Sequence, residues 1–327
     1  MPQVVDDDSY EDLLSLWSDL ESGMGVLLAH PASVQDFARK IAQYDHWMQT
    51  LLQQDTDASL YLLFQLATTS TIGYSTSHAL VCAALCHITA VEMALPAGHR
   101  TSLVRAAMTM NIAMTHLQDT LALQKERPTS AQQAAISTHA AHGRALLAER
   151  GIADALWLDI VGSHHQPLPT SGPATDAARL AAVLHTVDRY AAMISPRRSR
   201  AGGSASDSAR VITTARANAK RDDVSHALVK VVGLNPPGTF VRLDTGQVAV
   251  VLRRSGTEDQ PLVASVLDAQ GNPIHPPKLQ LVRSHGPRIK AGLPRSAVLL
   301  DLDHRTMVRL GIFAATRPRA APRPNNP

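Results

Sequence analysis

Aromatic residues and cysteines are scarce in this sequence. Phe, Trp and Tyr make up 4% of the 327 residues, and Cys82 and Cys86 are the only cysteines. Few large rings and abundant Ala and Leu exclude an aromatic core and favour closely packed helices with an aliphatic core. Two cysteines cannot build a disulfide framework. They share one face of a predicted helix, and we interpret them as small core residues in preference to a disulfide or a zinc site.

We expect no secretory leader, and the sequence has no long apolar run. Its start, MPQVVDDDSYEDLL, is acidic, and no apolar segment follows basic residues there. The most apolar segment, Ala79 to Leu95, contains His87 and Glu92 and is shorter than the roughly 20 residues that span a bilayer. We therefore expect a cytoplasmic protein that does not insert into a membrane.

Charge is unevenly distributed along the chain. Residues 286–327 hold eight Lys/Arg against two Asp, a net +6, whereas residues 1–285 hold 23 Lys/Arg against 26 Asp/Glu, a net −3. The Pro/Arg-rich end, ATRPRAAPRPNNP, is typical of a solvated, disordered segment and lacks the interleaved aromatics of a single-strand binding surface. We predict a largely disordered basic tail at 286–327 and no nucleic-acid partner.

Helical periodicity covers most of residues 9–234, and it predicts two helices before residue 54 and two more between Ala58 and Leu95, broken near Gly73. Predicted caps are Ser75 or Thr76, Thr101 or Ser102, Thr129 with Gln132, and Thr175, and Gly151 is a predicted helix stop. A Gly/Ser linker is expected from Gly202 to Ser208.

After Pro236-Pro-Gly238 the pattern changes to alternation. Val248, Val250 and Leu252 alternate with their neighbours, and Asp244-Thr-Gly246, Ser255-Gly256 and Gln270-Gly-Asn272 mark turns. This predicts a small meander of three or four strands. The domain prediction is an N-terminal helical region at 1–54, a helical domain at 55–234, a small β subdomain at 235–285 and the basic tail at 286–327.

Five histidine and aspartate positions, together with the stretch LVRAAMTMNIAMTHLQD from Leu103 to Asp119, carry a resemblance to a known family. They are His78 in YSTSHAL, His139 in HAAHG, the pair His164-His165, and Asp188 in VDRYAAMISPRRSR. In this order the motifs resemble the HD-GYP domain, the family of bacterial cyclic-di-GMP phosphodiesterases, over about residues 55–285. The resemblance implies a mainly α fold: an HD-GYP-like helical bundle followed by a small antiparallel β meander, closed by a PPGT-type segment.

The motif that names the family is altered. Where HD-GYP domains read roughly AALLHDIGK, with an adjacent His and Asp as metal ligands, this chain has Met110 and Asn111. In that family the Asp bridges two metal ions, and two dications about 3.5–4 Å apart need a shared anionic oxygen to offset their repulsion. The amide of Asn111 is neutral. The resemblance therefore predicts a degenerate site without a regular two-metal centre.

Two further family signatures are missing. Some members place a Glu for a third metal one turn before the first His, and Tyr74 occupies that position here. The family continues its His-His pair with Glu and an Asp-Gly-x-Gly-Tyr-Pro loop, whereas this chain reads Gln166-Pro-Leu-Pro-Thr-Ser-Gly-Pro173. We do not expect the surface that the Gly-Tyr-Pro loop forms.

By position, the resemblance assigns metal-ligand roles to five retained residues: His78, His139, His164, His165 and Asp188. The last three histidines can present three imidazoles to a single iron, manganese or zinc ion, with Asp188 as a ligand or as the partner that orients one. The alternative is that no metal binds and the histidines are ordinary packed residues. Five other histidines match no ligand position of the family, and we interpret them as surface or packing residues: His87, His99, His116, His142 and His185.

Arg197, Arg198 and Arg200 follow the predicted helix of Asp188, where the family has an Arg/Lys pair near the substrate phosphates. Planar guanidinium groups suit bidentate contacts with phosphate. The resemblance thus implies that these arginines bind a cyclic dinucleotide or another phosphoester. The alternative is a solvated turn ahead of the linker.

Three functions remain open at this point. The first is a degenerate HD-GYP protein that acts in cyclic-di-GMP signalling as a receptor or interaction module, with phosphodiesterase activity lost or strongly reduced. The second is an active phosphohydrolase with a single metal, acting on cyclic-di-GMP or a related phosphoester. The third is a scaffold whose N-terminal helices and basic tail recruit signalling proteins.

Overall fold

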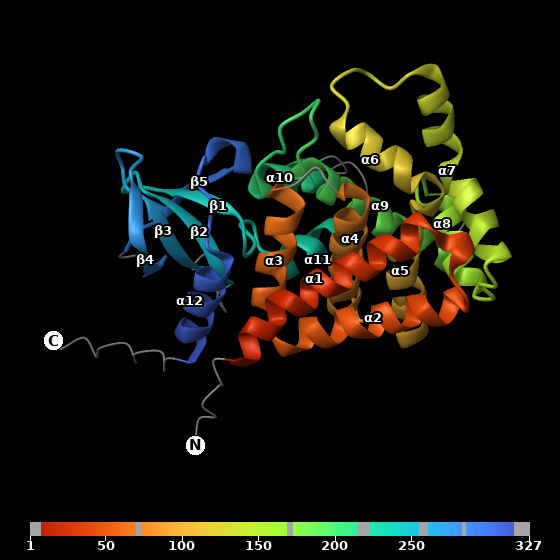
Figure 1. The fold of residues 1–327 in the computed structure, drawn as a ribbon, viewed down its shortest axis with the longest axis horizontal. Coiled ribbons are helices and arrows are strands. Elements are labelled where there is room, and N and C mark those ends of the chain that lie inside the picture. Colours follow the sequence, from red (N-terminus) through yellow and green to blue (C-terminus); the bar gives the residue numbers. More distant parts are fainter. Residues whose placement is uncertain are drawn as a thin grey trace.

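Helices build one side of the molecule and an antiparallel sheet builds the other (Figure 1). The structure is a computed structural model and describes residues 8–69, 73–168, 173–214, 223–254, 261–282 and 286–316. The helices are α1 (Asp8–Ala29), α2 (Phe37–Gln54), α3 (Thr56–Thr69), α4 (Tyr74–Glu92), α5 (Ala97–Thr109), α6 (Thr115–Leu123), α7 (Ser130–Glu149), α8 (Ala155–Ser163), α9 (Asp176–Ile194), α10 (Ala205–Thr214), α11 (Asp223–Val232) and α12 (His304–Thr316). Short 3₁₀ turns are η1 (Pro31–Ser33), η2 (Ile112–Met114) and η3 (Arg295–Ala297). This arrangement confirms the mainly α fold with a small antiparallel β unit.

Some helix ends follow the predicted caps. The Thr129 hydroxyl accepts from the Gln132 backbone N–H at 3.2 Å while the Gln132 side chain accepts from the Thr129 N–H at 2.9 Å, which is the predicted capping box. Thr175 caps α9, accepting from the Ala178 N–H. Gly151 follows α7 with φ of 82°, the left-handed conformation that favours glycine. The local sequence therefore determines these ends.

Other predicted caps are wrong because tertiary contacts use the same groups. α4 begins directly after Gly73, and Ser75 uses its N–H and hydroxyl to bind the Asp119 carboxylate of α6 at 2.7 and 2.9 Å. α5 begins after Pro96, and Thr101 and Ser102 lie inside it. The predicted Gly/Ser linker is also wrong in part, since α10 begins at Ala205 within it.

The stretch carrying Met110 and Asn111 is not one continuous helix. α5 ends at Thr109, Met110 is its C-cap, and Asn111 leads into η2 with φ of −105° and ψ of 13°. α6 starts only at Thr115. The two altered positions therefore lie at a bend between helices.

Two helices form the centre of the helical part. α4 is almost entirely buried, including Leu80, Cys82 and Cys86 at 0% exposure, and α9 packs against it. By length and composition α4 could cross a membrane, but 83% of its apolar window is buried inside the protein, as in a core helix. The same hydrophobic cluster includes residues of α1 and α2, so the N-terminal helices share the core of the helical domain.

The sheet has the strand order β4-β3-β2-β1-β5, and all neighbours are antiparallel. Its strands are β1 (Phe240–Leu243), β2 (Val248–Arg253), β3 (Leu262–Leu267), β4 (Pro273–Leu281) and β5 (Ile289–Leu293). Val248, Val250 and Leu252 join the main core, while Ala249 and Val251 face a second cluster on the other side. The alternation in the sequence therefore corresponds to two faces of the sheet, both of them buried. The predicted turn at Ser255-Gly256 lies outside the described residues.

The prediction of a largely disordered tail is wrong for residues 286–316. This segment forms β5, which brings the sheet to five strands where three or four were predicted. It also forms α12, whose Met307 and Val308 are 2% and 4% exposed. The Tyr61 hydroxyl and His304 Nδ1 are hydrogen-bonded at 3.0 Å and fix α12 to α3. Arg305 and Arg309 stay exposed, so the basic residues cover the outside of an amphipathic helix. Residues 317–327 lie outside the described part of the chain.

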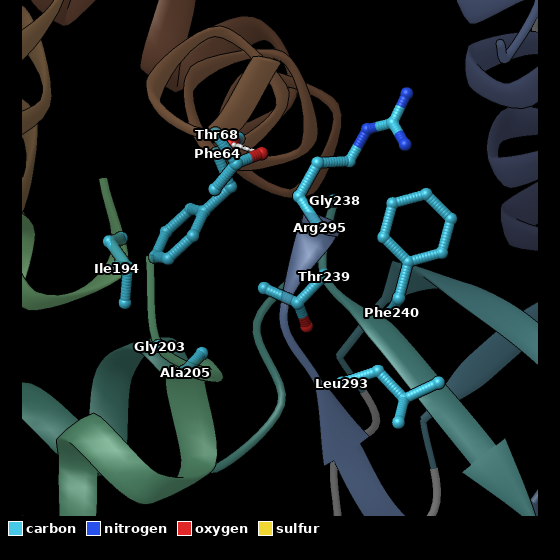
Figure 2. Close-up of a pocket in the computed structure, with 10 residues that line it drawn as sticks. All are labelled: Phe64, Thr68, Ile194, Gly203, Ala205, Gly238, Thr239, Phe240, Leu293 and Arg295. Carbon is cyan, nitrogen blue, oxygen red and sulfur yellow. Dashed lines mark hydrogen bonds between the residues drawn. The ribbon is translucent and has the colours of Figure 1, made fainter. Parts of the chain in front are cut away.

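Ion pairs and a tight glycine join the sheet to α3. Arg253 contacts Asp55 at 2.7 Å, and Arg254 contacts Asp57 at 2.5 Å. Gly238 has φ of 86°, and a Cβ placed on it would lie 2.5 Å from the backbone oxygen of Tyr61. Figure 2 shows that Gly238 and its neighbours line a small recess between α3, the start of α10 and strands β1 and β5. None of the predicted metal ligands lines this recess.

We expect Gly238→Ala to destabilise the protein much more than Gly271→Ala. Both glycines have a positive φ, 86° and 89°, but nothing lies within 4 Å of a Cβ at Gly271. Gly271→Ala should cost about 1–2 kcal/mol from backbone strain alone, and Gly238→Ala should cost several kcal/mol because α3 must move away. Urea unfolding of the two variants measures the difference, and equal losses would show that the sheet is not docked this tightly.

Candidate metal centre

Two glycines bring α7 and α8 close together and thereby place the first two histidines. A Cβ at Gly143 would lie 3.4 Å from Cγ1 of Val161, and a Cβ at Gly162 would lie 2.8 Å from Cδ of Arg144. His139 lies one turn before Gly143 on the same face of α7, and His164 is the C-cap of α8. The two imidazoles therefore meet across the helix contact, at 2% and 1% exposure.

Backbone carbonyls determine which ring nitrogen of each histidine carries hydrogen. Nδ1 of His139 contacts the carbonyl of Ile136, and Nδ1 of His164 contacts that of Val161 at 2.7 Å. A carbonyl only accepts, so both Nδ1 atoms donate and both Nε2 atoms carry a lone pair in the neutral rings. These Nε2 atoms face each other at 3.3 Å. A cation between two facing lone pairs, either a proton or a metal ion, stabilises this arrangement.

The spacing of the two nitrogens suits a metal ion. Two imidazole nitrogens on one tetrahedral ion, each at ~2.0–2.1 Å, lie ~3.3–3.4 Å apart. His165 joins them, with its ring centroid 4.0 Å from that of His164 and 5.1 Å from that of His139. All three residues offer a ligand atom within 4.8 Å of the others, and His165 is the exposed member. We name His139, His164 and His165 the three-histidine group.

A fourth histidine lies beside this group. The ring of His185 on α9 is 5.9 Å from that of His165, almost perpendicular to it, and its buried Nδ1 has no hydrogen-bond partner among the described residues. The prediction treated His185 as a surface or packing residue. Its spacing of three residues before Asp188, which puts both on one face of α9, was the signal that could have identified it.

The remaining two predicted ligands form a second group. Nε2 of His78 and Oδ1 of Asp188 are 2.7 Å apart, and Sγ of Cys82 is 3.6 Å from the same nitrogen. His78 and Cys82 lie one turn apart on α4, and Asp188 comes from α9. We name these the His78 group. The prediction interpreted Cys82 as a core residue, and it is buried, but its sulfur also belongs to a set of potential metal ligands.

Electrostatics connects the two groups. Burial acts to raise the pKa of Asp188, but the hydrogen bond and charge of His78, and the charges of His164 and His165, outweigh it and hold the pKa at about 2. Burial, and then the charge of His165, lower the pKa of His164 to about 4. Burial raises the pKa of the Cys82 thiol well above its usual range. At neutral pH the site therefore combines a carboxylate, a neutral thiol and a neutral imidazole at His164.

One of the three predicted phosphate-binding arginines reaches the His78 group. Tyr74 stacks on His78 with ring centroids 5.5 Å apart, and the Arg197 guanidinium lies 5.0 Å from the centre of the Tyr74 ring while donating to its hydroxyl at 3.1 Å. Nε of Arg197 is buried without a hydrogen-bond partner in the described structure. Arg198 and Arg200 are exposed, and Arg200 donates to the Ala192 carbonyl.

Comparisons with known proteins identify the fold that carries these groups. The chain is 23% identical over 251 residues to a cyclic di-GMP phosphodiesterase of Pseudomonas aeruginosa, PA4108, an alignment that covers 75% of this chain and 57% of the relative. Its fold matches Bd1817, an HDG"Y"P protein from Bdellovibrio bacteriovorus, with a TM-score of 0.52 and 11% identity over 70% of this chain and 74% of that one. No protein-family model matches. This chain has an HD-GYP-type fold.

Within this HD-GYP-type fold, the altered pair is placed differently from the five predicted ligands. Met110 is 1% exposed and belongs to the hydrophobic core, so its thioether packs among apolar side chains. The backbone carbonyl of Asn111 accepts from the Met114 N–H at 2.8 Å and forms the turn of η2. The five predicted ligands divide into the three-histidine group and the His78 group instead of forming one set.

The HD-GYP family is metal-dependent, and the three-histidine group of this chain fits a metal ion. Its donor atoms are three imidazole nitrogens, and the paired lone pairs at 3.3 Å are an arrangement that a cation stabilises. Hydrogen bonds from Nδ1 to carbonyls are the usual support for ligands that bind through Nε2. In the His78 group, by contrast, Nε2 already shares a hydrogen with Asp188. The nitrogens of the three-histidine group are therefore arranged for a metal more closely than the donor atoms of the His78 group.

We expect His139→Ala to abolish binding of Mn²⁺ at the three-histidine group, with the affinity falling at least about 100-fold, because even a lost supporting partner costs roughly 10- to 100-fold. His142→Ala is the matched control, since His142 is an exposed histidine on the same helix and belongs to neither ligand group. Titration calorimetry measures both affinities. Equal binding by the two variants would show that these imidazoles hold no metal.

Proposed function

We propose that this chain is a degenerate HD-GYP-type protein that binds a cyclic dinucleotide in bacterial cyclic-di-GMP signalling and turns it over slowly or not at all. We place it in the cytoplasm, where a signalling protein would recognise the nucleotide-bound form. The predicted ligands for the nucleotide are the three arginines Arg197, Arg198 and Arg200, and the predicted metal ligands are the five residues of the two groups.

The replacement of the acidic bridge carries this proposal. Two dications at the usual ~3.5–4 Å separation need an anionic oxygen between them, and the amide of Asn111 is neutral while Met110 is packed in the core. A single ion can polarise a phosphate and activate a bound water, but it loses the second cation that would stabilise the leaving oxygen. Loss of that stabilisation lowers the rate of hydrolysis without removing the features that bind phosphate.

Arg197 supports the binding part of the proposal. Its guanidinium is held over Tyr74, the ring that stacks on His78, and its Nε is a buried donor without a partner among the described residues. A buried N–H of this kind is costly unless an acceptor completes it. A phosphate oxygen is such an acceptor, and charge-assisted contacts of arginine with phosphate are among the stronger hydrogen bonds.

We expect cyclic-di-GMP to bind the wild-type protein in calorimetry and to remain intact during prolonged incubation with Mn²⁺. Arg197→Ala should weaken binding by roughly 10- to 100-fold, the value of one to two charge-assisted hydrogen bonds. Arg189→Ala, an exposed arginine of α9 outside both ligand groups, should bind as the wild type does. No binding by the wild type at high nucleotide concentration would reject the receptor, and rapid linearisation would reject the loss of activity.

An active single-metal phosphohydrolase is the alternative, and the prepared geometry of the three-histidine group favours it. When bound there, a divalent ion would supply a Lewis acid and an activated water. His139, His164 and His165 would hold it, and Asp188, with a pKa of about 2, would remain a carboxylate whose negative charge offsets part of the charge of the ion. Tyr74 and Arg197 would orient the phosphate.

Restoring the family pair distinguishes the two functions. If the missing ligands limit turnover, the double variant Met110→His with Asn111→Asp should hydrolyse cyclic-di-GMP at least about 100-fold faster than the wild type, since the second ion supplies several kcal/mol of charge stabilisation. Adding His139→Ala to the double variant should remove the gain. A folded, metal-loaded double variant with the wild-type rate would show that Met110 and Asn111 do not limit the chemistry.

A further inference from the structure

The structure assigns Cys82 as a third metal ligand beside His78 and Asp188, forming a site for a thiophilic ion such as Zn²⁺ that is separate from the three-histidine group. This inference deepens the proposed function, because it places a cation at the group on which Tyr74 stacks, and Tyr74 in turn holds Arg197, a predicted ligand of the nucleotide phosphate.

The positions of the three donor atoms support the assignment. Sγ of Cys82 and Nε2 of His78 are 3.6 Å apart, and an imidazole nitrogen at ~2.0–2.1 Å and a sulfur at ~2.3 Å on one tetrahedral ion lie ~3.5–3.6 Å apart. The Asp188 oxygen lies within 4.8 Å of both. Oδ1 of Asp188 is 2.7 Å from Nε2 of His78, whereas a nitrogen and an oxygen bound to one tetrahedral ion lie ~3.4 Å apart. An ion that replaces the shared hydrogen must therefore move these two atoms apart by ~0.7 Å.

The fold supplies the ligands from two rigid elements. His78 and Cys82 are one turn apart on α4, which is buried along almost its whole length, and Asp188 comes from α9, which packs against it. The side chain of Asp188 is 19% exposed to solvent, so an ion can reach the site from the side of Asp188. Three protein ligands leave a fourth position open for water or a phosphate oxygen, and Arg197 lies on the adjoining Tyr74.

The charges and protons of this site balance. Binding forms Zn–S, Zn–N and Zn–O bonds, and it breaks the S–H bond of Cys82 and the N–H bond at Nε2 of His78. Nδ1 of His78, which has no partner in the described structure, takes up one proton, and the other leaves to the buffer. A dication then lies against one carboxylate and one thiolate, so the buried charges cancel. Sulfur ligation favours zinc over the harder manganese and magnesium ions.

Cobalt substitution tests the assignment with a readout that does not depend on activity. Co²⁺ added to the metal-free full chain should produce a sulfur-to-cobalt charge-transfer band in the near ultraviolet, because Cys82 and Cys86 are the only possible thiolates. Cys82→Ala should remove the band and weaken Zn²⁺ binding at this site at least about 100-fold. Cys86→Ala is the matched control, since Cys86 is equally buried on the same helix but belongs to no ligand group.

Three results would overturn the assignment: no charge-transfer band in the wild type, a band that persists in Cys82→Ala, or a band lost only in Cys86→Ala. The wild-type spectrum and the Cys86→Ala spectrum decide the matter even if Cys82→Ala fails to fold. These outcomes are separate from nucleotide binding, so failure here would leave the receptor proposal to its own calorimetric test.

Discussion

The hydrogen bond between His78 and Asp188 is the contact on which the arrangement of the centre depends. It joins the two central helices α4 and α9 where the surroundings are apolar, and it keeps the Asp188 carboxylate charged against its burial. Tyr74 stacks on His78, and Arg197 stacks on Tyr74 in turn. A shift of His78 would therefore move the aromatic ring and the guanidinium as well. Low dielectric surroundings make this set of contacts strong when complete and costly when one partner is missing.

Met110 and Asn111 alter the chemistry expected of the centre, while its helical framework is present. Met110 fills the bend after α5 with an apolar side chain of the main core, and the helices that carry the five candidate ligands pack in the pairs α4–α9, α7–α8 and α8–α9. The candidate ligands form a nitrogen-rich group and a mixed group with sulfur and oxygen. Ligand softness favours different ions at two such groups. Under the proposals above, two unlike cations would take the place of a bridged pair of like ions.

Attachment to the sheet and to α3 explains why residues 286–316 of the basic C-terminal segment form a strand and a helix. β5 completes the sheet edge, and α12 packs its apolar face on α3 and β2 while its arginines remain in solvent. The ion pairs of Arg253 and Arg254 with Asp55 and Asp57 lie at the same junction. Composition describes the average of a segment, and a high Pro/Arg content obscured the short apolar stripe that includes Met307 and Val308.

The sequence by itself determined the helical class, the capping box at Thr129 and the alternating strands, because these depend on local periodicity, and the order of its motifs gave the five candidate ligand positions. Only the tertiary structure decided that the ligands form two groups, that His185 and Cys82 lie beside them, and that Ser75 binds Asp119 instead of capping its helix. Each of these facts depends on a contact between helices far apart in the chain. Side-chain spacing along one helix does not reveal which atoms another helix will bring within a few ångströms.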